Sequence, residues 1–165
     1  MDERLLLELR AERDIARLQA TYSALCDDGF PPTQISDLFV EDGVWESSPL
    51  EVRCEGRSQI AEHFATAGPM YPWSMHINVP LGIDLAEDGR TAHGSWHLLM
   101  PCTDRSSGEE QAGWLAGTYR NTFVLIDDAW RFQHLRVAFE LMTPHLTDWA
   151  ANRFGLARKP GPSPQ

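Results

Sequence analysis

The sequence is poor in cysteine, in basic residues and in long apolar runs, and each shortage argues against a class of protein. Its three cysteines, an odd number without CxxC spacing, indicate neither a disulfide framework nor a thiolate metal site. Lys and Arg number 14 against 24 Asp and Glu, and the net charge of −10 argues against nucleic acid or membrane as a partner. No apolar run reaches the roughly 20 residues of a membrane span, and the charged N-terminus does not read as a signal peptide. These absences predict a cytoplasmic protein.

The sequence also lacks the motifs of the common cofactor sites. GxGxxG, P-loop and GxSxG patterns are absent, so dinucleotide, nucleotide triphosphate and α/β-hydrolase chemistry have no support. His93 and His97 share one face of a predicted strand, but about 13 Å of strand separates them, too far to bind one metal ion. We therefore predict that the protein acts on a small molecule and needs neither a metal ion nor a cofactor.

The length of 165 residues predicts one domain over residues 1–150, followed by a flexible tail over residues 151–165. A domain of this size buries roughly 70% of its unfolded surface, which is enough for a core and a cavity. Six Trp and seven Phe are available to line that cavity.

The first half of the sequence predicts helices. Residues 3–26 carry apolar side chains at three-to-four spacing, namely Leu5, Leu6, Leu9, Ile15, Leu18, Tyr22 and Leu25. Gly29 and the prolines after it end this helix. A short second helix is expected to bury Ile35, Leu38 and Phe39, and a third covers residues 58–67. Between them, a turn at residues 41–43 and strands over 44–46 and 51–54 predict a hairpin.

The second half predicts four long strands, over residues 73–84, 91–100, 114–126 and 130–142, with turns at 87–89 and 127–129. Helices followed by an antiparallel meander define the α+β class, and strands this long are expected to curl into a cone. Alternation in the last strand predicts one face with Leu135, Val137, Phe139 and Leu141, and another with Trp130, Phe132, His134 and Arg136.

The strand over residues 73–84 has two unlike faces. The first is apolar and fit for a core, with Met75, Ile77, Val79, Leu81 and Ile83. The second carries His76 and Asn78, about 7 Å apart. A solvent-exposed face would favour Lys, Glu or Thr, so the pair of His76 and Asn78 indicates an enclosed polar pocket. The alternative is that His76 is an ordinary histidine at the surface or at the edge of the core.

A series of segments taken in order resembles the SnoaL-like branch of the NTF2-like superfamily: Tyr22–Asp27 in the first helix, DLFVEDGVWE (37–46), EGRSQIAEHF (55–64), His76 early in the first long strand, GTYRNTF (117–123), AWRFQHLRV (129–137) and TPHLTDWA (143–150). The likeness covers about residues 10–150. Members of that branch include scytalone dehydratase, bile-acid 7α-dehydratase, polyketide cyclases and the β subunits of ring-hydroxylating dioxygenases. The resemblance implies a cone-shaped barrel with one deep apolar pocket, assembled as a homodimer or homotrimer.

The same resemblance implies catalytic residues. Tyr22, Asp27 and His76 match the Tyr, Asp and His of the dehydratases by position, and Arg136 matches an Arg on the last strand. A histidine titrates near neutrality and suits a general base, while an aspartate on its other nitrogen would fix the tautomer. Either Asp27 or Asp28 could face the pocket. Core packing of Tyr22 and a surface ion pair of Arg136 are the structural alternatives.

The leading hypothesis is a cofactor-independent dehydratase, isomerase or cyclase acting on a small, largely apolar, oxygenated cyclic metabolite. The residues predicted to contact this substrate are Asn78, Tyr119, Trp45, Trp96, His97, Trp114 and Phe132. The segment from Thr143 is a candidate lid. The alternative is a non-catalytic binding protein, or a structural subunit resembling the dioxygenase β chain.

Overall fold

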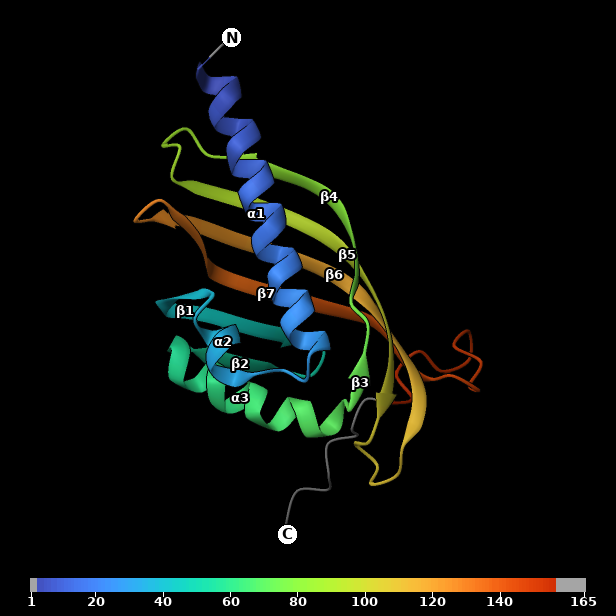
Figure 1. Cartoon of the computed structure of the whole chain (residues 1–165). Helices are drawn as coiled ribbons and strands as arrows, with labels where there is room; N and C mark the ends of the chain where they lie inside the picture. The colour runs from blue at the N-terminus through green and yellow to red at the C-terminus, as the bar shows by residue number, and fades with distance from the viewer. Residues whose placement is uncertain (1–2, 157–165) are drawn as a thin grey trace.

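The computed structural model of the protein describes residues 3–156, and its elements follow the predicted order of helices and then long strands (Figure 1). The helices are α1 (Glu3–Asp27), α2 (Pro32–Ser36) and α3 (Gly56–Met70). The strands are β1 (Phe39–Ser48), β2 (Val52–Glu55), β3 (Trp73–Ser74), β4 (Ile77–Leu85), β5 (Thr91–Asp104), β6 (Gln111–Ile126) and β7 (Ala129–Pro144). Within residues 3–156, no helix is long and apolar enough to cross a membrane.

The strands form one curved mixed sheet that does not close on itself. Its order is β2-β1-β7-β6-β5-β3, and β4 pairs with β5 on the same side as β3. Strands β5, β6 and β7 form the predicted antiparallel meander, whereas β1 joins β7 in parallel. Helix α1 crosses the hollow of the sheet, and α3 closes the end next to β1 and β2 (Figure 1). The α+β prediction is therefore confirmed.

Helix α1 contributes an apolar stripe to the core. Its buried residues recur at helical spacing and include Ala11, Ile15, Leu18, Tyr22 and Cys26. The amino-terminal turns extend past the sheet (Figure 1), so Leu5 and Leu9 of the predicted apolar pattern are 47% and 51% exposed.

Two predicted boundaries change because tertiary pairing overrides local signals. Phe39 was expected on the second helix, but it begins β1, where it pairs with Phe132 and is fully buried. The turn expected at residues 41–43 is part of β1, whose register against β7 shifts between Phe39 and Val44. Helix α3 continues through Pro69 to Met70.

Strand β7 does not keep the simple alternation that its sequence predicts. Its register against β6 shifts twice, so Phe123 pairs with Phe132 while the preceding Thr122 pairs with His134. At this shift β7 contains one extra, unpaired residue, which turns every later side chain of the strand to the opposite face of the sheet. Phe132 therefore lies in the core with Leu135, whereas His134 and Arg136 face outward. At the other shift, a Cβ on Gly117 would lie 2.2 Å from the Ala138 carbonyl oxygen, so this close approach requires glycine.

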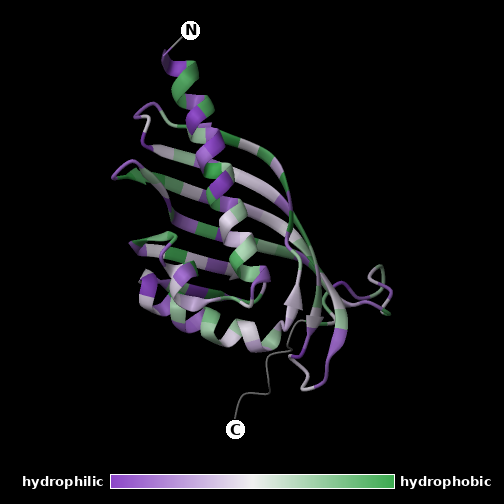
Figure 2. Cartoon of the chain, in the orientation of Figure 1, coloured by the Kyte–Doolittle hydropathy of each residue, from purple (hydrophilic) through white to green (hydrophobic). Residues whose placement is uncertain are grey.

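In the strand over residues 73–84, the polar face turns inward and most of the apolar face is exposed to solvent. Four residues of its apolar face lie outside the core: Met75, Ile77, Val79 and Leu81 are 49%, 42%, 54% and 52% exposed, and β4 is largely green in Figure 2. Ile83, which follows the register shift between Pro80 and Gly82, packs against the core as predicted. The face with His76 and Asn78 turns toward α1 instead. There α1 offers one polar partner to each side chain, Asp27 to His76 and Ser23 to the Asn78 amide N–H.

Candidate active site

The clearest polar contact in the hollow of the sheet joins the end of α1 to the β3–β4 edge. The Asp27 carboxylate lies 2.6 Å from Nδ1 of His76, accepts the backbone N–H of His76 with both oxygens at 3.0 Å, and accepts the Ser74 hydroxyl at 3.1 Å. Because a carboxylate only accepts, the proton belongs on Nδ1, which leaves Nε2 as a base. The His76 side chain is only 6% exposed.

Asp27 is held as an ionised partner. Partial burial opposes its charge, but the hydrogen bonds from the side chain and backbone of His76 and from Ser74 lower the pKa of Asp27. Asp28, on the same turn, is exposed and makes no comparable contact in the described part of the chain. The structure thus distinguishes the two carboxylates that the sequence left open.

The end of α1 also positions an aromatic ring beside the dyad. Gly29 and Phe30 both have left-handed backbone conformations, with φ of +83° and +58°. Glycine adopts this conformation freely, but a bulky residue rarely does, so the chain stores strain at Phe30. The reversal places the Phe30 ring with its centroid 6.2 Å from that of His76 and 6.1 Å from that of Phe64.

His76 lines a cavity of about 100 Å³ between α1, α3 and the sheet. Its walls are largely apolar and include Phe30, Phe64, Met100, Leu115, Val137 and Phe139. The polar groups on its walls come from Tyr22, Trp45, Ser47, His63, Tyr71, His76 and Tyr119. This combination of an apolar enclosure with a few convergent polar groups is typical of a small-molecule site.

Two buried tyrosines supply hydroxyl groups on the cavity wall. The Trp45 indole N–H donates to the Tyr22 hydroxyl over 3.0 Å, and the Tyr22 and Tyr119 rings meet edge to face at 6.3 Å. Burial raises the pKa of both tyrosines well above the usual value, so both keep their protons. Tyr22 therefore combines core packing with a position in the site, and Tyr119 and Trp45 line the cavity as predicted.

Sequence reasoning missed His63. It lies on α3, where its ring packs against Trp45 with centroids 4.4 Å apart and lines the cavity. Burial lowers the pKa of His63, so the neutral imidazole is favoured. The only available signal was its place beside Phe64 in the EGRSQIAEHF segment, where it sits between residues predicted to face inward.

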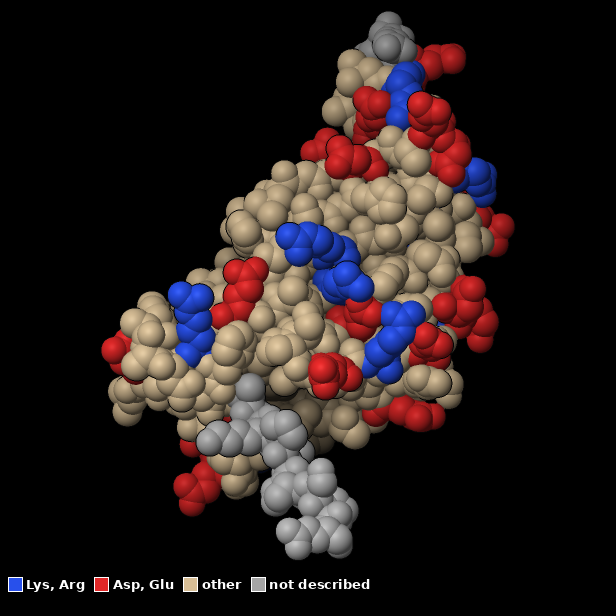
Figure 3. All heavy atoms as spheres, turned by 180° about the vertical axis from the view of Figure 1, so that it is seen from behind, with Lys and Arg blue, Asp and Glu red and all other residues tan. Residues whose placement is uncertain are grey.

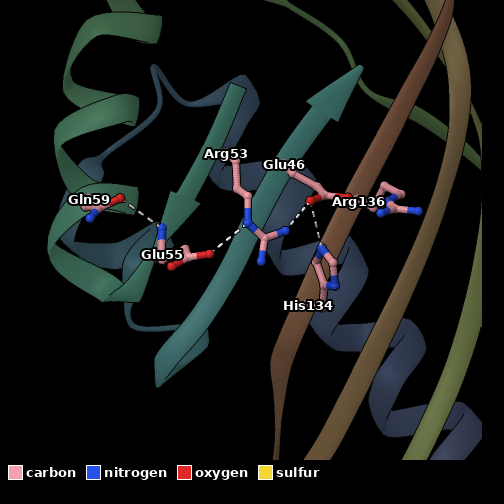
Figure 4. Close-up of polar contacts among 6 residues, drawn as sticks. All are labelled: Glu46, Arg53, Glu55, Gln59, His134 and Arg136. Atoms are coloured by element: carbon pink, nitrogen blue, oxygen red, sulfur yellow. Dashed lines mark hydrogen bonds and ion pairs between the residues drawn. The ribbon is translucent and has the colours of Figure 1, made fainter. Parts of the chain in front are cut away.

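Arg136 lies outside the cavity. It is on the outer face of the sheet, where it pairs with Glu46, as Arg53 also does (Figure 4). The same carboxylate lies 3.5 Å from Nε2 of His134. Figure 3 shows basic and acidic side chains together on this side of the molecule. The role inferred for Arg136 from the resemblance has no support from its position, because the sheet backbone separates it from His76.

The other predicted contact residues divide between core and surface. Trp96 and Phe132 are buried against Phe123, away from the cavity wall. The expectation that they contact substrate is therefore not supported. His97 is exposed on the outer face, opposite Val79 in the β4–β5 pairing.

Trp114 and Asn78 also make other contacts. The Trp114 indole N–H donates to Nδ1 of His145 over 2.9 Å, outside the cavity. The Asn78 amide donates to the Ser23 hydroxyl over 2.6 Å, which ties β4 to α1. Asn78 therefore faces inward as predicted but serves the helix–sheet contact.

The segment after β7 does not cover the cavity as far as it is described. No residue from 143 to 156 lines the cavity. Met142 instead donates its N–H to the Arg153 carbonyl and accepts from the Leu156 N–H, which holds the chain alongside the end of β7. The lid hypothesis has no support in these residues, and residues 157–165 of the predicted tail lie outside the described residues.

Comparisons with known proteins agree with this architecture. A candidate scytalone dehydratase from Novosphingobium aromaticivorans DSM 12444 is 24% identical, with a TM-score of 0.75 over 86% of this chain and 92% of that one. Hexachlorocyclohexane dehydrochlorinase LinA-type3 from Novosphingobium barchaimii LL02 is 16% identical, with a TM-score of 0.74 over 87% and 95%. An NTF2-like protein from Novosphingobium aromaticivorans is 23% identical, with a TM-score of 0.60 over 83% and 84%.

These structural likenesses show the fold, and the sequence itself shows the family. No curated protein matches the chain significantly. The SnoaL-like domain matches residues 7–136, which is most of the chain and includes Tyr22, Asp27 and His76. The chain therefore belongs to the SnoaL-like domain family.

Proposed function

We propose that this protein is a cofactor-independent lyase that removes a small leaving group from a neutral, mostly apolar ring compound. The observation that carries the proposal is the Asp27–His76 pair at the wall of an apolar cavity. The fold supports it by analogy, since the names of two structural relatives, a dehydratase and a dehydrochlorinase, both describe eliminations.

The proposed reaction uses His76 as the base. Nε2 removes a proton from a substrate carbon, the C–H electron pair becomes the new double bond, and the leaving group departs with its bonding pair. Asp27 orients the imidazole and stabilises the positive charge that His76 acquires. A departing oxygen receives its proton from the Tyr22 or Tyr119 hydroxyl, which both remain protonated.

The size of the cavity favours a single ring over a polycyclic substrate. Pockets for drug-sized ligands measure roughly 300–1,000 Å³, and an apolar cavity of roughly 150 Å³ holds benzene. The cavity here is about 100 Å³. A compact ring therefore fits with a small adjustment of the walls, whereas a larger ring system would extend beyond this cavity.

A suitable test is the ring opening of 1,2-benzisoxazole, in which a base removes the C3 proton while the N–O bond breaks. The wild type should accelerate this elimination, and His76→Gln should lose roughly 10²–10⁴-fold, the usual contribution of a general base. Met100→Leu is the matched control and should keep close to the wild-type rate, because Met100 lines the same cavity but carries no group that can transfer a proton. Equal rates for the wild type and His76→Gln would contradict the proposal and favour the non-catalytic alternative.

A further inference from the structure

The cavity has a second polar region, away from the dyad, that the proposed reaction does not use. Ser47 and His63 both line the cavity, Ser47 from β1 and His63 from α3. The dyad comes from the end of α1 and the β3–β4 edge, on the other side of the hollow (Figure 1). The stacked rings of Phe30 and Phe64 connect the two regions, since Phe30 contacts His76 and Phe64 contacts His63.

The Ser47 hydroxyl is the feature that points to a ligand. Ser47 is only 4% exposed, and its Oγ has no hydrogen-bond partner in the described structure. A buried hydroxyl without a partner is costly, and most buried polar groups are satisfied. Trp45, two residues earlier on the same strand face and hence about 7 Å away, packs against His63, so Ser47 and His63 belong to one wall.

The chemistry of this wall selects the kind of group that it can bind. Burial lowers the pKa of His63, so the imidazole is neutral and offers one donor and one acceptor nitrogen. Ser47 offers a donor and an acceptor as well. Among the described residues on the cavity wall there is no Lys or Arg that would balance a carboxylate or phosphate. A neutral oxygen matches this set, whereas an anion does not.

We propose that Ser47 and His63 form a recognition site for a neutral oxygen of the substrate, namely a hydroxyl or a carbonyl, at the end of the ring remote from His76. The substrate class is then a single ring with two functional ends. One end carries the acidic C–H bond and the leaving group and faces His76. The other carries an uncharged oxygen that hydrogen-bonds to Ser47 and His63 and fixes the orientation of the ring.

This inference rests on the proposed function for the identity of the ligand as substrate, but the recognition site can be measured without turnover. Phenol and toluene are suitable probes because they have nearly the same shape and differ in one hydroxyl group. Their dissociation constants would be measured by NMR titration of the full chain, in the wild type and in three variants. The variants are Ser47→Ala, which removes only the hydroxyl, His63→Phe, which keeps the ring against Trp45, and His76→Gln.

The wild type should bind phenol about tenfold more tightly than toluene, because one satisfied hydrogen bond corresponds to about a fivefold to tenfold change in affinity. Ser47→Ala and His63→Phe should each remove most of this preference while binding toluene within about twofold of the wild type. Phenol should shift the ring nitrogen resonances of His63 more than those of His76. His76→Gln should keep the preference even if it has lost the elimination activity.

Three results would overturn the recognition site. The first is a wild type that binds phenol no more tightly than toluene, including binding neither. The second is an unchanged preference in both Ser47→Ala and His63→Phe. The third is loss of the preference in His76→Gln alone, which would place the phenol hydroxyl at the dyad. Folding does not obscure these outcomes, since the Ser47 hydroxyl has no partner to lose and Ser47→Ala should match the wild type in stability.

Discussion

The Asp27 carboxylate forms hydrogen bonds with both the backbone N–H and the Nδ1 of His76, a residue 49 positions further along the chain. A single side chain at the end of α1 therefore fixes both the position of the β3–β4 edge and the tautomer of the imidazole. Met75 N–H donates to the Pro101 carbonyl in β5, so the next N–H, that of His76, points away from β5 toward the free edge of the sheet, where Asp27 accepts it. The structural and chemical roles of Asp27 are inseparable in this geometry.

Asp27→Asn should reduce the elimination of 1,2-benzisoxazole even though it preserves the shape of the side chain. The amide lacks the negative charge that stabilises the protonated imidazole and can present a donor to Nδ1, which favours the wrong tautomer. We expect a loss of roughly 10²-fold or more in kcat/KM, within the range of general acid–base catalysis. Asp28→Asn changes an exposed carboxylate on the same turn and should retain the wild-type rate; equal losses in both variants would contradict the assignment.

The stability of the fold should depend on the charge of Asp27 in acid. The pKa of Asp27 is lowered in the folded state, so its contribution is present above the unfolded value of about 3.9 and is lost as the pH falls through the folded value. Urea unfolding of the wild type and Asp27→Asn should therefore show a difference in the free energy of unfolding that is largest above about pH 5 and shrinks below about pH 4. A difference that grows in acid would have the wrong sign.

Tyr22→Phe should destabilise the core because it leaves the buried Trp45 N–H without an acceptor. An unsatisfied buried donor costs about 1–3 kcal/mol. Tyr119→Phe is the matched control, since Tyr119 is equally buried but no hydrogen bond of its hydroxyl occurs in the described structure; it should cost less than about 1 kcal/mol. Thermal or urea unfolding of the two variants measures the difference, and equal costs would show that the Trp45–Tyr22 bond contributes little.

Arg136→Gln should affect stability slightly and catalysis hardly at all. The Arg136 side chain is 54% exposed and pairs with Glu46 on the outer face, where ion pairs contribute about 0–1 kcal/mol. Its rate with 1,2-benzisoxazole should stay within about twofold of the wild type, in contrast to His76→Gln. A large loss of activity with unchanged stability would restore the role inferred from the resemblance.

The homodimer or homotrimer implied by the resemblance stays a prediction, and sedimentation equilibrium of the full chain measures it. The partly exposed apolar side chains of Ile77 and Val79 on β4 give a place to disturb such an assembly. If this face joins copies of the chain, Val79→Glu should lower the measured mass, while Leu146→Glu, an exposed change elsewhere, should not. A monomeric wild type would contradict the predicted homodimer or homotrimer.

The sequence by itself determined the element order, the α+β class and the association of Tyr22, Asp27 and His76 with one site. Helical spacing and strand alternation are local patterns that burial enforces residue by residue, so they survive into the fold. The segments in the first helix and the first long strand also carried the family resemblance, and the SnoaL-like domain match confirms it.

Only the tertiary structure decided which face of each strand turns inward. Period-two alternation cannot choose between faces, and one extra residue near His134 reverses the assignment for the residues beyond it. The extra residue explains why Arg136 lies outside the cavity although Phe132 is buried. The ambiguity of alternation explains why apolar Ile77 and Val79 are exposed while His76 points inward. His63 and Ser47 likewise became visible only when β1 and α3 were brought together, because the pairing of side chains from separate elements is not encoded in the spacing of either.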